Sequence, residues 1–210
     1  MKKKVTVIDY GAGNILSLQR ALEYLSVNVD VTSDPKKIEK SSYLILPGDG
    51  AFAFAVKNLK KKRIFNLLIN HVNKQKPLFG ICLGMQLLMT ESNEFGKTHG
   101  LDIIKGKISK IVEKNDNIKV PAIGWSELSI NQKSSSQYLE IIKNFNKKKF
   151  YFVHSYKAET YYKNDLLAYY YHGKNKVSAI IGRENVIGTQ FHPEKSGKNG
   201  INLIKKFLTL

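Results

Sequence analysis

The sequence predicts a single α/β domain over residues 1–210, built on a central, mostly parallel sheet with an antiparallel extension. As far as about residue 91, short apolar strands alternate with helical stretches, which is typical of a parallel sheet with helices on both faces. Beyond that point, short β-patterned pieces follow one another across turns, which favours antiparallel pairing. The only cysteine, Cys82, lies between Gly80 and Gly84, where an apolar strand runs into a helix.

The first half of the chain contains the parallel strands. We expect strands over 4–9, 27–32 and 42–46, and a helix over 15–26. One long helix is predicted over 52–74, because its apolar positions fall roughly on one face, and another from 85 to about 91. Gly11 and Gly13 follow the first strand, but no third glycine stands at the Rossmann spacing, so dinucleotide binding is disfavoured.

The second half is predicted to be an antiparallel continuation of the sheet that carries a histidine back toward the cysteine. The expected strands span 106–112, 120–123, 150–153, 167–171, 177–181 and 186–191, and a final helix spans 200–210. The last of these strands leads directly into His192. The other histidines singled out, His71, His99 and His172, are expected at the surface.

The amino-acid composition limits the kinds of protein that this chain can be. Of the 210 residues, 42% are hydrophobic, which suffices for one domain with a sizeable core. No apolar run is long enough to span a membrane, and the basic N-terminus lacks the long apolar core of a signal peptide. A single cysteine excludes an internal disulfide and fits a reducing cytoplasm. We therefore expect a cytoplasmic protein.

The net charge of +17 does not by itself identify a binding partner. The lysines occur in short scattered runs and no nucleic-acid motif accompanies them, so lysine-rich solvated faces are the favoured interpretation. An aromatic platform for nucleic acid made by the tyrosines of 161–171 is disfavoured in the same way. No spacing of Cys and His suits a metal, and neither a metal nor a cofactor is expected.

The two glycines that flank Cys82 have the spacing typical of a nucleophile elbow, a turn so tight that side chains at the flanking positions would collide. Such a turn lifts the sulfur out of the sheet edge, and the amino end of the following helix favours a thiolate there. A cysteine in an apolar run is otherwise most often a small buried hydrophobe. A partner base elsewhere in the chain is therefore needed to support the nucleophile.

The segment His192-Pro193-Glu194 supplies that base. Because the proline ring fixes φ, the two flanking side chains are held in one relation at the end of a strand. A cysteine, a histidine and a carboxylate that orients the histidine are the parts of an activated thiol nucleophile. Cys82, His192 and Glu194 are therefore the predicted catalytic residues.

These motifs resemble those of the class I glutamine amidotransferases. The resemblance lies in Gly80-Ile-Cys82-Leu-Gly84-Met-Gln86 and Phe191-His192-Pro193-Glu194. Three further stretches, at 9–14, 46–48 and 151–156, are similar to the glutaminase subunits of imidazole glycerol phosphate synthase. The motifs run from residue 9 to residue 196, so the resemblance covers essentially the whole chain. It implies the flavodoxin-like three-layer fold of that family and hydrolysis of glutamine to glutamate and ammonia.

The tetrahedral oxyanion that forms when a thiolate attacks an amide carbon needs two donors placed where its charge develops. Gly48 and Gly50 would let the backbone N–H of Asp49 turn toward the site, and the N–H of Leu83 would be the second donor. Where the family usually has an apolar residue, this chain has Asp49, whose charge would disfavour a thiolate unless it points outward. By resemblance, glutamine is bound by Gln86, by the loop at Gly48 and Gly50, and by the backbone around Ser155 and Tyr156.

The resemblance also implies a partner, because no synthase domain is present. The implied partner is a (β/α)₈ cyclase subunit that receives ammonia in a heterodimer and makes imidazole glycerol phosphate and AICAR in histidine biosynthesis. Asn14, Trp125 and Lys195 are the residues expected at this interface. Ala122 and Ser126 depart from the residues usual beside Trp125, where His and Asn are common. Trp125 itself is either a core aromatic or an exposed interface residue.

Three alternatives stay open at this point. The chain could be a paralogue that supplies ammonia to another cyclase-like partner, for example one that amidates surface sugars. It could be a non-catalytic subunit, although Cys82, His192 and Glu194 are all present. A basic module that binds nucleic acid is the least favoured.

Overall fold

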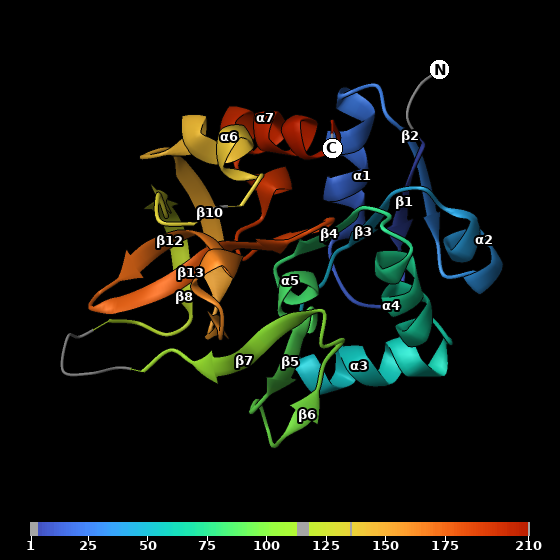
Figure 1. Ribbon diagram of the computed structural model, residues 1–210, viewed down its shortest axis with the longest axis horizontal. Helices are drawn as coiled ribbons and strands as arrows, with labels where there is room; N and C mark the ends of the chain where they lie inside the picture. Colours follow the sequence, from blue (N-terminus) through green and yellow to red (C-terminus); the bar gives the residue numbers. More distant parts are fainter. Residues whose placement is uncertain (1–3, 113–117, 135, 210) are drawn as a thin grey trace.

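A computed structural model describes residues 4–112, 118–134 and 136–209, and it contains an eight-stranded sheet at its centre (Figure 1). The order of strands across this sheet is β2 (Asn28–Thr32), β1 (Lys4–Ile8), β3 (Leu44–Leu46), β4 (Leu78–Ile81), β14 (Val186–Thr189), β13 (Asn175–Arg183), β12 (Leu166–His172) and β9 (Ser129–Ile130). The first five strands pair in parallel and the last three are added antiparallel. The predicted sheet, parallel with an antiparallel extension, is confirmed.

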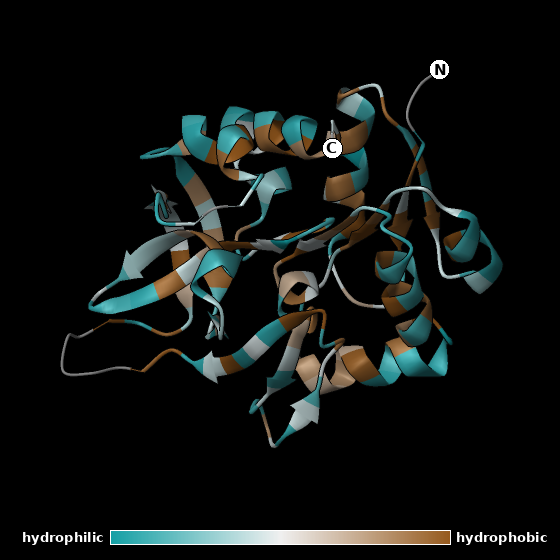
Figure 2. Ribbon diagram, in the orientation of Figure 1, coloured by the Kyte–Doolittle hydropathy of each residue, from teal (hydrophilic) through white to brown (hydrophobic). Residues whose placement is uncertain are grey.

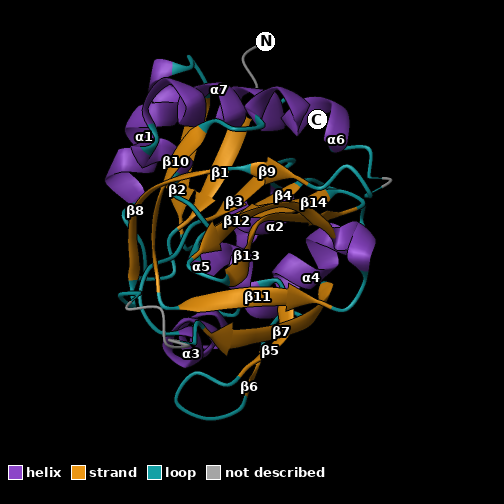
Figure 3. Cartoon of the chain, turned by 90° about the vertical axis from the view of Figure 1, so that its left-hand side faces the viewer, coloured by secondary structure: helices purple, strands orange, loops and turns teal. Residues whose placement is uncertain are grey.

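Helices cover both faces of the sheet and give three layers. The helices are α1 (Ile15–Tyr24), α2 (Pro35–Lys40), α3 (Phe52–Lys61), α4 (Phe65–Asn73), α5 (Leu83–Leu87), α6 (Leu139–Ile142) and α7 (Gly197–Phe207). Figure 3 shows α1 and α7 on one side of the sheet, and α3 on the other. Two separate hydrophobic clusters fill the layers: Leu18 and Phe207 belong to one, and Phe52 and Leu68 to the other. Because successive strand side chains point to opposite faces, an apolar strand supplies both clusters.

The central strands are apolar because both of their faces are covered. All three residues of β3 and all four of β4 are buried. Figure 2 shows the hydrophobic colour concentrated on these strands and on the inward side of α1 and α7. The lysines lie mostly on outward positions, as in α7, where Lys205 and Lys206 are exposed beside buried Phe207. The positive charge is therefore largely a solvated surface.

Two smaller sheets stand beside the central one. The four-stranded sheet has the order β11 (Tyr156–Thr160), β7 (Ile104–Lys110), β5 (Met89–Ser92) and β6 (Thr98–His99), and the two-stranded sheet pairs β10 (Lys149–His154) with β8 (Ala122–Glu127). Short 3-10 helices follow at η1 (Lys143–Phe145), η2 (Lys163–Asp165) and η3 (Pro193–Lys195). The sequence did not predict β5, β6, β9, β11, α2 or α6, since each is short and lacks a clear period.

The long helix predicted over 52–74 is wrong, because the chain forms two helices there. After α3, Arg63 adopts a left-handed conformation with φ of 59°. Its amide donates to the carbonyl of Lys60, and the amide of Ile64 donates to Leu59, which is the hydrogen-bond pattern of a Schellman motif. Ile64 is fully buried and anchors the stop. A non-glycine residue at this position gave no sequence signal.

The helix predicted from 85 to about 91 is also wrong in extent. It begins at Leu83 and ends at Leu87, and Met89 already starts β5. The N–H groups of Leu101, Ile103 and Ile104 donate to carbonyls of Leu87 and Leu88, so a returning segment takes the acceptors that further helical turns would use. Tertiary hydrogen bonds thus end the helix.

Smaller differences concern the ends of elements and one histidine. The strand expected over 186–191 ends at Thr189, and the final helix begins at Gly197, with residue 210 outside the described part. His71 was expected at the surface but is 4% exposed, and its Nε2 lies 3.0 Å from the carbonyl of Pro77. Among the described helices, none combines the length and the hydropathy that crossing a membrane requires.

Candidate active site

Cys82 lies at the end of β4 in a strained backbone conformation, with φ of 53° and ψ of −110°. Glycine is required on both sides of it. A Cβ on Gly84 would lie 1.8 Å from the carbonyl oxygen of Leu46, and one on Gly80 would lie 2.8 Å from the backbone of Gly84 and Met85. Strain of this kind persists only where the surroundings enforce it, and it is concentrated at functional sites. The predicted tight elbow is present.

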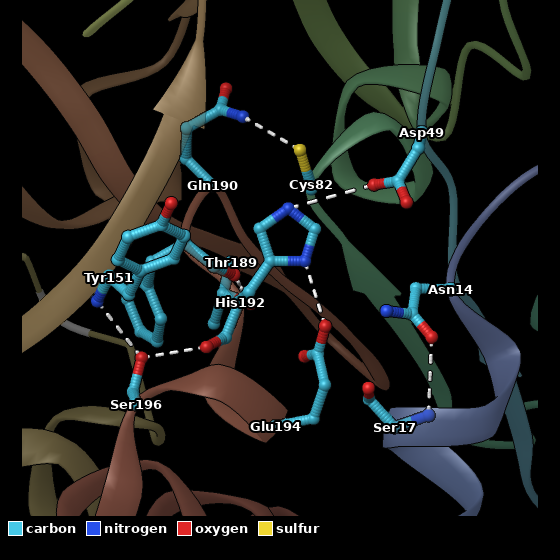
Figure 4. Close-up of polar contacts among 11 residues, drawn as sticks. Asn14, Ser17, Asp49, Cys82, Tyr151, Thr189, Gln190, His192, Glu194 and Ser196 are labelled. Carbon is cyan, nitrogen blue, oxygen red and sulfur yellow. Dashed lines mark hydrogen bonds and ion pairs between the residues drawn. The ribbon is translucent and has the colours of Figure 1, made fainter. Parts of the chain in front are cut away.

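The parallel pairing of β4 with β14 brings His192 to the cysteine. Gly188 is in register with Gly80 and Thr189 with Ile81, and the amide of Cys82 donates to the carbonyl of Thr189 at 2.7 Å. Both strands therefore end at the same edge of the sheet. Figure 4 shows the imidazole of His192 beside the sulfur of Cys82, and their ligand atoms lie within 4.8 Å of each other.

Glu194 orients this imidazole. Nδ1 of His192 lies 2.8 Å from Oε1 of Glu194, and the side chains are 3% and 4% exposed. The hydroxyl of Ser196 donates to the carbonyl of His192 at 2.6 Å and accepts the amide of Tyr151, which holds the turn (Figure 4). Nucleophile, base and orienting carboxylate are thus arranged in series.

The environment of His192 favours its protonated form. Burial lowers the pKa of the imidazole, but the adjacent Cys82 and Glu194 more than offset this and raise the pKa to about 10. A second buried histidine, His154, behaves in the opposite way, since burial lowers its pKa to about 4. An imidazolium beside a cysteine is the arrangement that supports a thiolate nucleophile.

Asp49 points into the site rather than away from it. Its Oδ1 lies 3.6 Å from Nε2 of His192, on the edge of the ring that faces Cys82 (Figure 4). The side chain is 44% exposed, so water reaches it. The sequence left the direction of this carboxylate open, because a loop between two glycines has many accessible conformations. Asp49, Cys82 and His192 together are the one group of described residues with the donors to hold a metal ion.

The predicted oxyanion donor at Leu83 is occupied in this arrangement. Its amide donates to the carbonyl of Gly48 at 3.3 Å. A Cβ on Gly48 would lie 2.3 Å from the hydroxyl of Tyr10, so the loop is tightly packed from behind. Gly50 has φ of 93° and no atom within 4 Å of a Cβ built there, which leaves it room to move. The peptide between Gly48 and Asp49 must therefore turn before Leu83 can serve as a donor.

A pocket of about 640 Å³ opens above the sulfur. Its lining contains Asp49, Gly50, Cys82, Leu83, Gln86, Glu94, Phe95, Lys110, Pro121, Val153, His154, Ser155, Tyr156 and Lys195. Of the predicted substrate residues, Gly50, Gln86, Ser155 and Tyr156 are thus gathered at one cavity with the nucleophile. Gly48 is not part of the lining and packs against Leu83 and Gly84.

Several residues at the site were missed by the sequence analysis, among them Gln190, Glu94 and Lys110, which lines the pocket. Gln190 is fully buried; its Nε2 lies 3.6 Å from the sulfur of Cys82, and its Oε1 accepts a hydrogen bond from Gln86 at 3.0 Å. Its position two residues before His192 was a usable signal. Glu94 lines the pocket, and its Oε2 accepts the amide of Phe52 at 2.7 Å. No local pattern distinguished this glutamate, because it lies between β5 and β6, which the sequence did not predict.

The residues predicted at a partner interface all lie at the surface. Asn14 is exposed and caps α1, accepting the amide of Ser17 at 3.3 Å. Trp125 is 55% exposed and contacts the ring of Tyr151 edge-on, so the core alternative for this tryptophan is wrong. Lys195 is exposed at the rim of the pocket.

The tyrosines of 161–171 divide between the surface and the interior. Tyr161, Tyr162 and Tyr171 are exposed, whereas Tyr170 is 1% exposed and lies 2.7 Å from Nε2 of His154 through its hydroxyl. Because strand side chains alternate between faces, one residue in two of such a run is turned inward.

Comparison with known proteins agrees with this geometry. A model of the glutamine amidotransferase class-I family matches residues 6–210. A protein of Lactococcus lactis named imidazole glycerol phosphate synthase subunit HisH is 41% identical over 207 residues, which cover 98% of each chain. A protein of the same name from Caldanaerobacter subterraneus is 42% identical over 203 residues, covering 97% of this chain and 96% of that one.

Solved structures agree on the fold. A structure titled as a glutamine amidotransferase superposes with a TM-score of 0.74 at 17% identity, covering 98% of this chain and 97% of that one. The structure of PurLQS from Thermotoga maritima gives a TM-score of 0.72 at 17% identity, covering 100% and 99%. The family model and the full-length relatives together establish that the chain belongs to the class I glutamine amidotransferase family.

Proposed function

We propose that this protein is the glutaminase subunit of an imidazole glycerol phosphate synthase, hydrolysing glutamine and delivering ammonia to a cyclase subunit in histidine biosynthesis. The observation that carries the proposal is the arrangement of Cys82, His192 and Glu194 at a strained elbow, opening into a pocket of about 640 Å³. Relatives with that name match nearly the whole chain at 41% and 42% identity, which supports this acceptor over the alternative of another amidated product.

In the proposed reaction, the sulfur of Cys82 attacks the side-chain amide carbon of glutamine. His192 holds the proton taken from the thiol and transfers it to the departing nitrogen, which leaves as ammonia. Glu194 keeps the ring oriented and stabilises its positive charge. Water then hydrolyses the thioester, which gives glutamate and restores the thiol.

The oxyanion that forms in each step needs donors. We assign this role to the backbone amides of Leu83 and Asp49. Because the Leu83 amide is bonded to the carbonyl of Gly48, the 47–50 loop must rearrange to release it. The freedom of Gly50 at φ of 93° supports such a turn. The arrangement described here therefore corresponds to a resting enzyme of low turnover.

The pocket offers complementary groups for an amino acid. Glu94 supplies a carboxylate for the α-ammonium group, and Lys110 and Lys195 supply positive charge for the α-carboxylate. Gln86 lies against the backbone of Tyr156, with 3.3 Å between its Nε2 and that carbonyl. Together with the backbone at Ser155, these groups would orient the glutamine with its side chain toward Cys82.

The cyclase partner is proposed to be a (β/α)₈ barrel that docks over Asn14, Trp125 and Lys195 and forms a heterodimer with this protein. Residues 1–210 are proposed to form a single domain. Ammonia becomes ammonium in neutral water and ceases to be a nucleophile, so a sheltered path to a bound acceptor raises its effective concentration. The exposed Trp125 and the position of Lys195 at the pocket rim support this location.

The test is reconstitution with a purified cyclase subunit. We expect glutamate release to be slow for the isolated chain and to rise by at least about tenfold with the cyclase subunit and its substrate, together with glutamine-dependent formation of imidazole glycerol phosphate. Cys82→Ala should abolish both with glutamine, while ammonium salts still support the cyclase. Unchanged glutamate release by Cys82→Ala would exclude the mechanism, and stimulation by a different synthase alone would exclude the acceptor.

A further inference from the structure

Asp49, Cys82 and His192 bring a carboxylate oxygen, a sulfur and an imidazole nitrogen to one point. These atoms all lie within 4.8 Å of one another. The three side chains come from the loop after β3, the start of α5 and the turn after β14, and Figure 4 shows Asp49 and Cys82 on the same edge of the imidazole. The proposed glutaminase chemistry uses the sulfur and the nitrogen but has no role for the carboxylate.

We propose that these three side chains form a binding site for Zn²⁺. Zinc in proteins takes sulfur, imidazole nitrogen and carboxylate oxygen in a tetrahedron, with bonds of about 2.0–2.3 Å. That geometry places pairs of ligand atoms roughly 3.3–3.6 Å apart. Oδ1 of Asp49 and Nε2 of His192 are already 3.6 Å apart. Small movements of the cysteine and aspartate side chains complete the set.

The surroundings of the ligands are those of a metal site. Nε2 of His192 is buried without a hydrogen-bond partner among the described residues, on a side chain that is 3% exposed. Nδ1 of the same ring is held by Glu194 at 2.8 Å, and a carboxylate on the far nitrogen orients a metal-bound histidine. The side-chain amide of Gln190 approaches the sulfur at 3.6 Å, where it stabilises a negative charge.

Charge and access also fit the ion. A thiolate and a carboxylate balance the two positive charges of Zn²⁺, and the one proton shared by Cys82 and His192 passes to solvent. Asp49 is 44% exposed at the mouth of the pocket, which leaves an entry path and a fourth position for water. Because the ion would occupy both nucleophile and base, its binding would silence glutamine hydrolysis reversibly.

The test measures metal binding directly, so its outcome does not depend on the proposed function. The metal-free chain is titrated with Zn²⁺ by calorimetry, and with Co²⁺ by absorption, where a bound thiolate gives a charge-transfer band. We expect one ion per chain. Removing a group that only hydrogen-bonds to a metal ligand already costs about 10–100-fold in metal affinity. Asp49→Asn and Cys82→Ser each change a proposed ligand itself, so each should weaken Zn²⁺ binding by at least about tenfold.

Two control variants separate this site from adventitious binding. Asp30→Asn removes an aspartate that lies on β2 and pairs with Lys4. His99→Gln removes an exposed histidine that faces Glu91 across β5 and β6. Both should keep the wild-type affinity for Zn²⁺ and the cobalt band. The proposal is wrong if Asp49→Asn binds Zn²⁺ as tightly as wild type, or if a tight ion persists in Cys82→Ser. The proposal also fails if the wild type binds no Zn²⁺ at about 100 µM, or if His99→Gln abolishes binding. Circular dichroism checks that each variant is folded.

Discussion

Nδ1 of His192 and Oε1 of Glu194 lie 2.8 Å apart across a single proline, with both side chains almost fully buried. The carboxylate is one of the two neighbours that raise the pKa of this histidine. Any change at Glu194 should therefore alter both the orientation of the ring and the pH range over which it is charged.

Glu194→Gln should lower glutamine hydrolysis by about 10²–10⁴-fold in the complex with the cyclase subunit, because an amide neither stabilises the imidazolium nor fixes the tautomer as a carboxylate does. The pKa of His192, followed by NMR, should fall from the value of about 10 in the wild type. Glu91→Gln, which removes a surface partner of Lys97, is the control. An unchanged turnover in Glu194→Gln would exclude the orienting role.

The same pair predicts a pH dependence of stability. Because the folded pKa of His192 is raised from 6.5 to about 10, the stabilisation is complete below pH 6.5 and is lost as the pH rises through about 10. Thermal unfolding of the wild type should therefore lose more stability between pH 7 and pH 10 than that of Glu194→Gln. Parallel curves for the two proteins would contradict the pKa shift.

Acid should destabilise the protein through its two neutral buried histidines. Burial lowers the pKa of both His71 and His154 from 6.5 to about 4. Since the unfolded chain binds these protons more readily, stability is complete above pH 6.5 and falls as the pH drops toward 4. Between pH 7 and pH 5, the melting temperature of His71→Gln should fall by less than that of the wild type. His99→Gln, at an exposed position, should follow the wild type, and equal losses in all three proteins would refute the prediction.

Gly84→Ala should destabilise the fold and displace the nucleophile. The new Cβ would lie 1.8 Å from the carbonyl of Leu46, a clash with backbone that costs about 3 kcal/mol or more. For a chain of this size, that corresponds to a fall in melting temperature of roughly 6–12 °C. Gly197→Ala is the matched control, because nothing lies within 4 Å of its Cβ and only the cost of φ at +57°, about 1–2 kcal/mol, applies. Equal melting temperatures for the two variants would show that the close approach at Gly84 is absent.

Trp125→Ala should weaken binding to the proposed cyclase subunit without unfolding the chain. A large exposed aromatic at the centre of an interface contributes about 2 kcal/mol or more, so the dissociation constant should rise by at least about 30-fold. Because Trp125 is 55% exposed, the melting temperature of the variant should stay near that of the wild type. Tyr24→Ala, at a residue that is 79% exposed at the far end of α1, should leave binding unchanged. Equal affinities for Trp125→Ala and wild type would remove Trp125 from the interface.

Local features of the sequence determined the parallel strands, the elbow and the catalytic pair. Each depends on neighbours in the chain: the glycines two residues either side of Cys82 permit the turn, and Pro193 fixes how His192 and Glu194 lie. The register of the strand before His192 was not among these features, because the sequence analysis placed residues 186–191 in the antiparallel half, whereas β14 pairs in parallel with β4 and both strands end at one edge of the sheet. The meeting of Cys82 and His192, 110 positions apart, was instead predicted from the chemistry of an activated thiol and from the resemblance of the two motifs to the family.

Only the tertiary structure decided the local conformation at places where groups distant in the chain compete for the same backbone hydrogen bonds or the same space. The break of the 52–74 helix depends on a left-handed Arg63 closed by the buried Ile64, and the end of α5 depends on amides that return from residues 101–104. The direction of Asp49 and the bond from Leu83 to Gly48 are set by packing around a loop that the glycines leave free. A sequence fixes the conformations that a loop can reach, but the contacts of the folded chain select one of them.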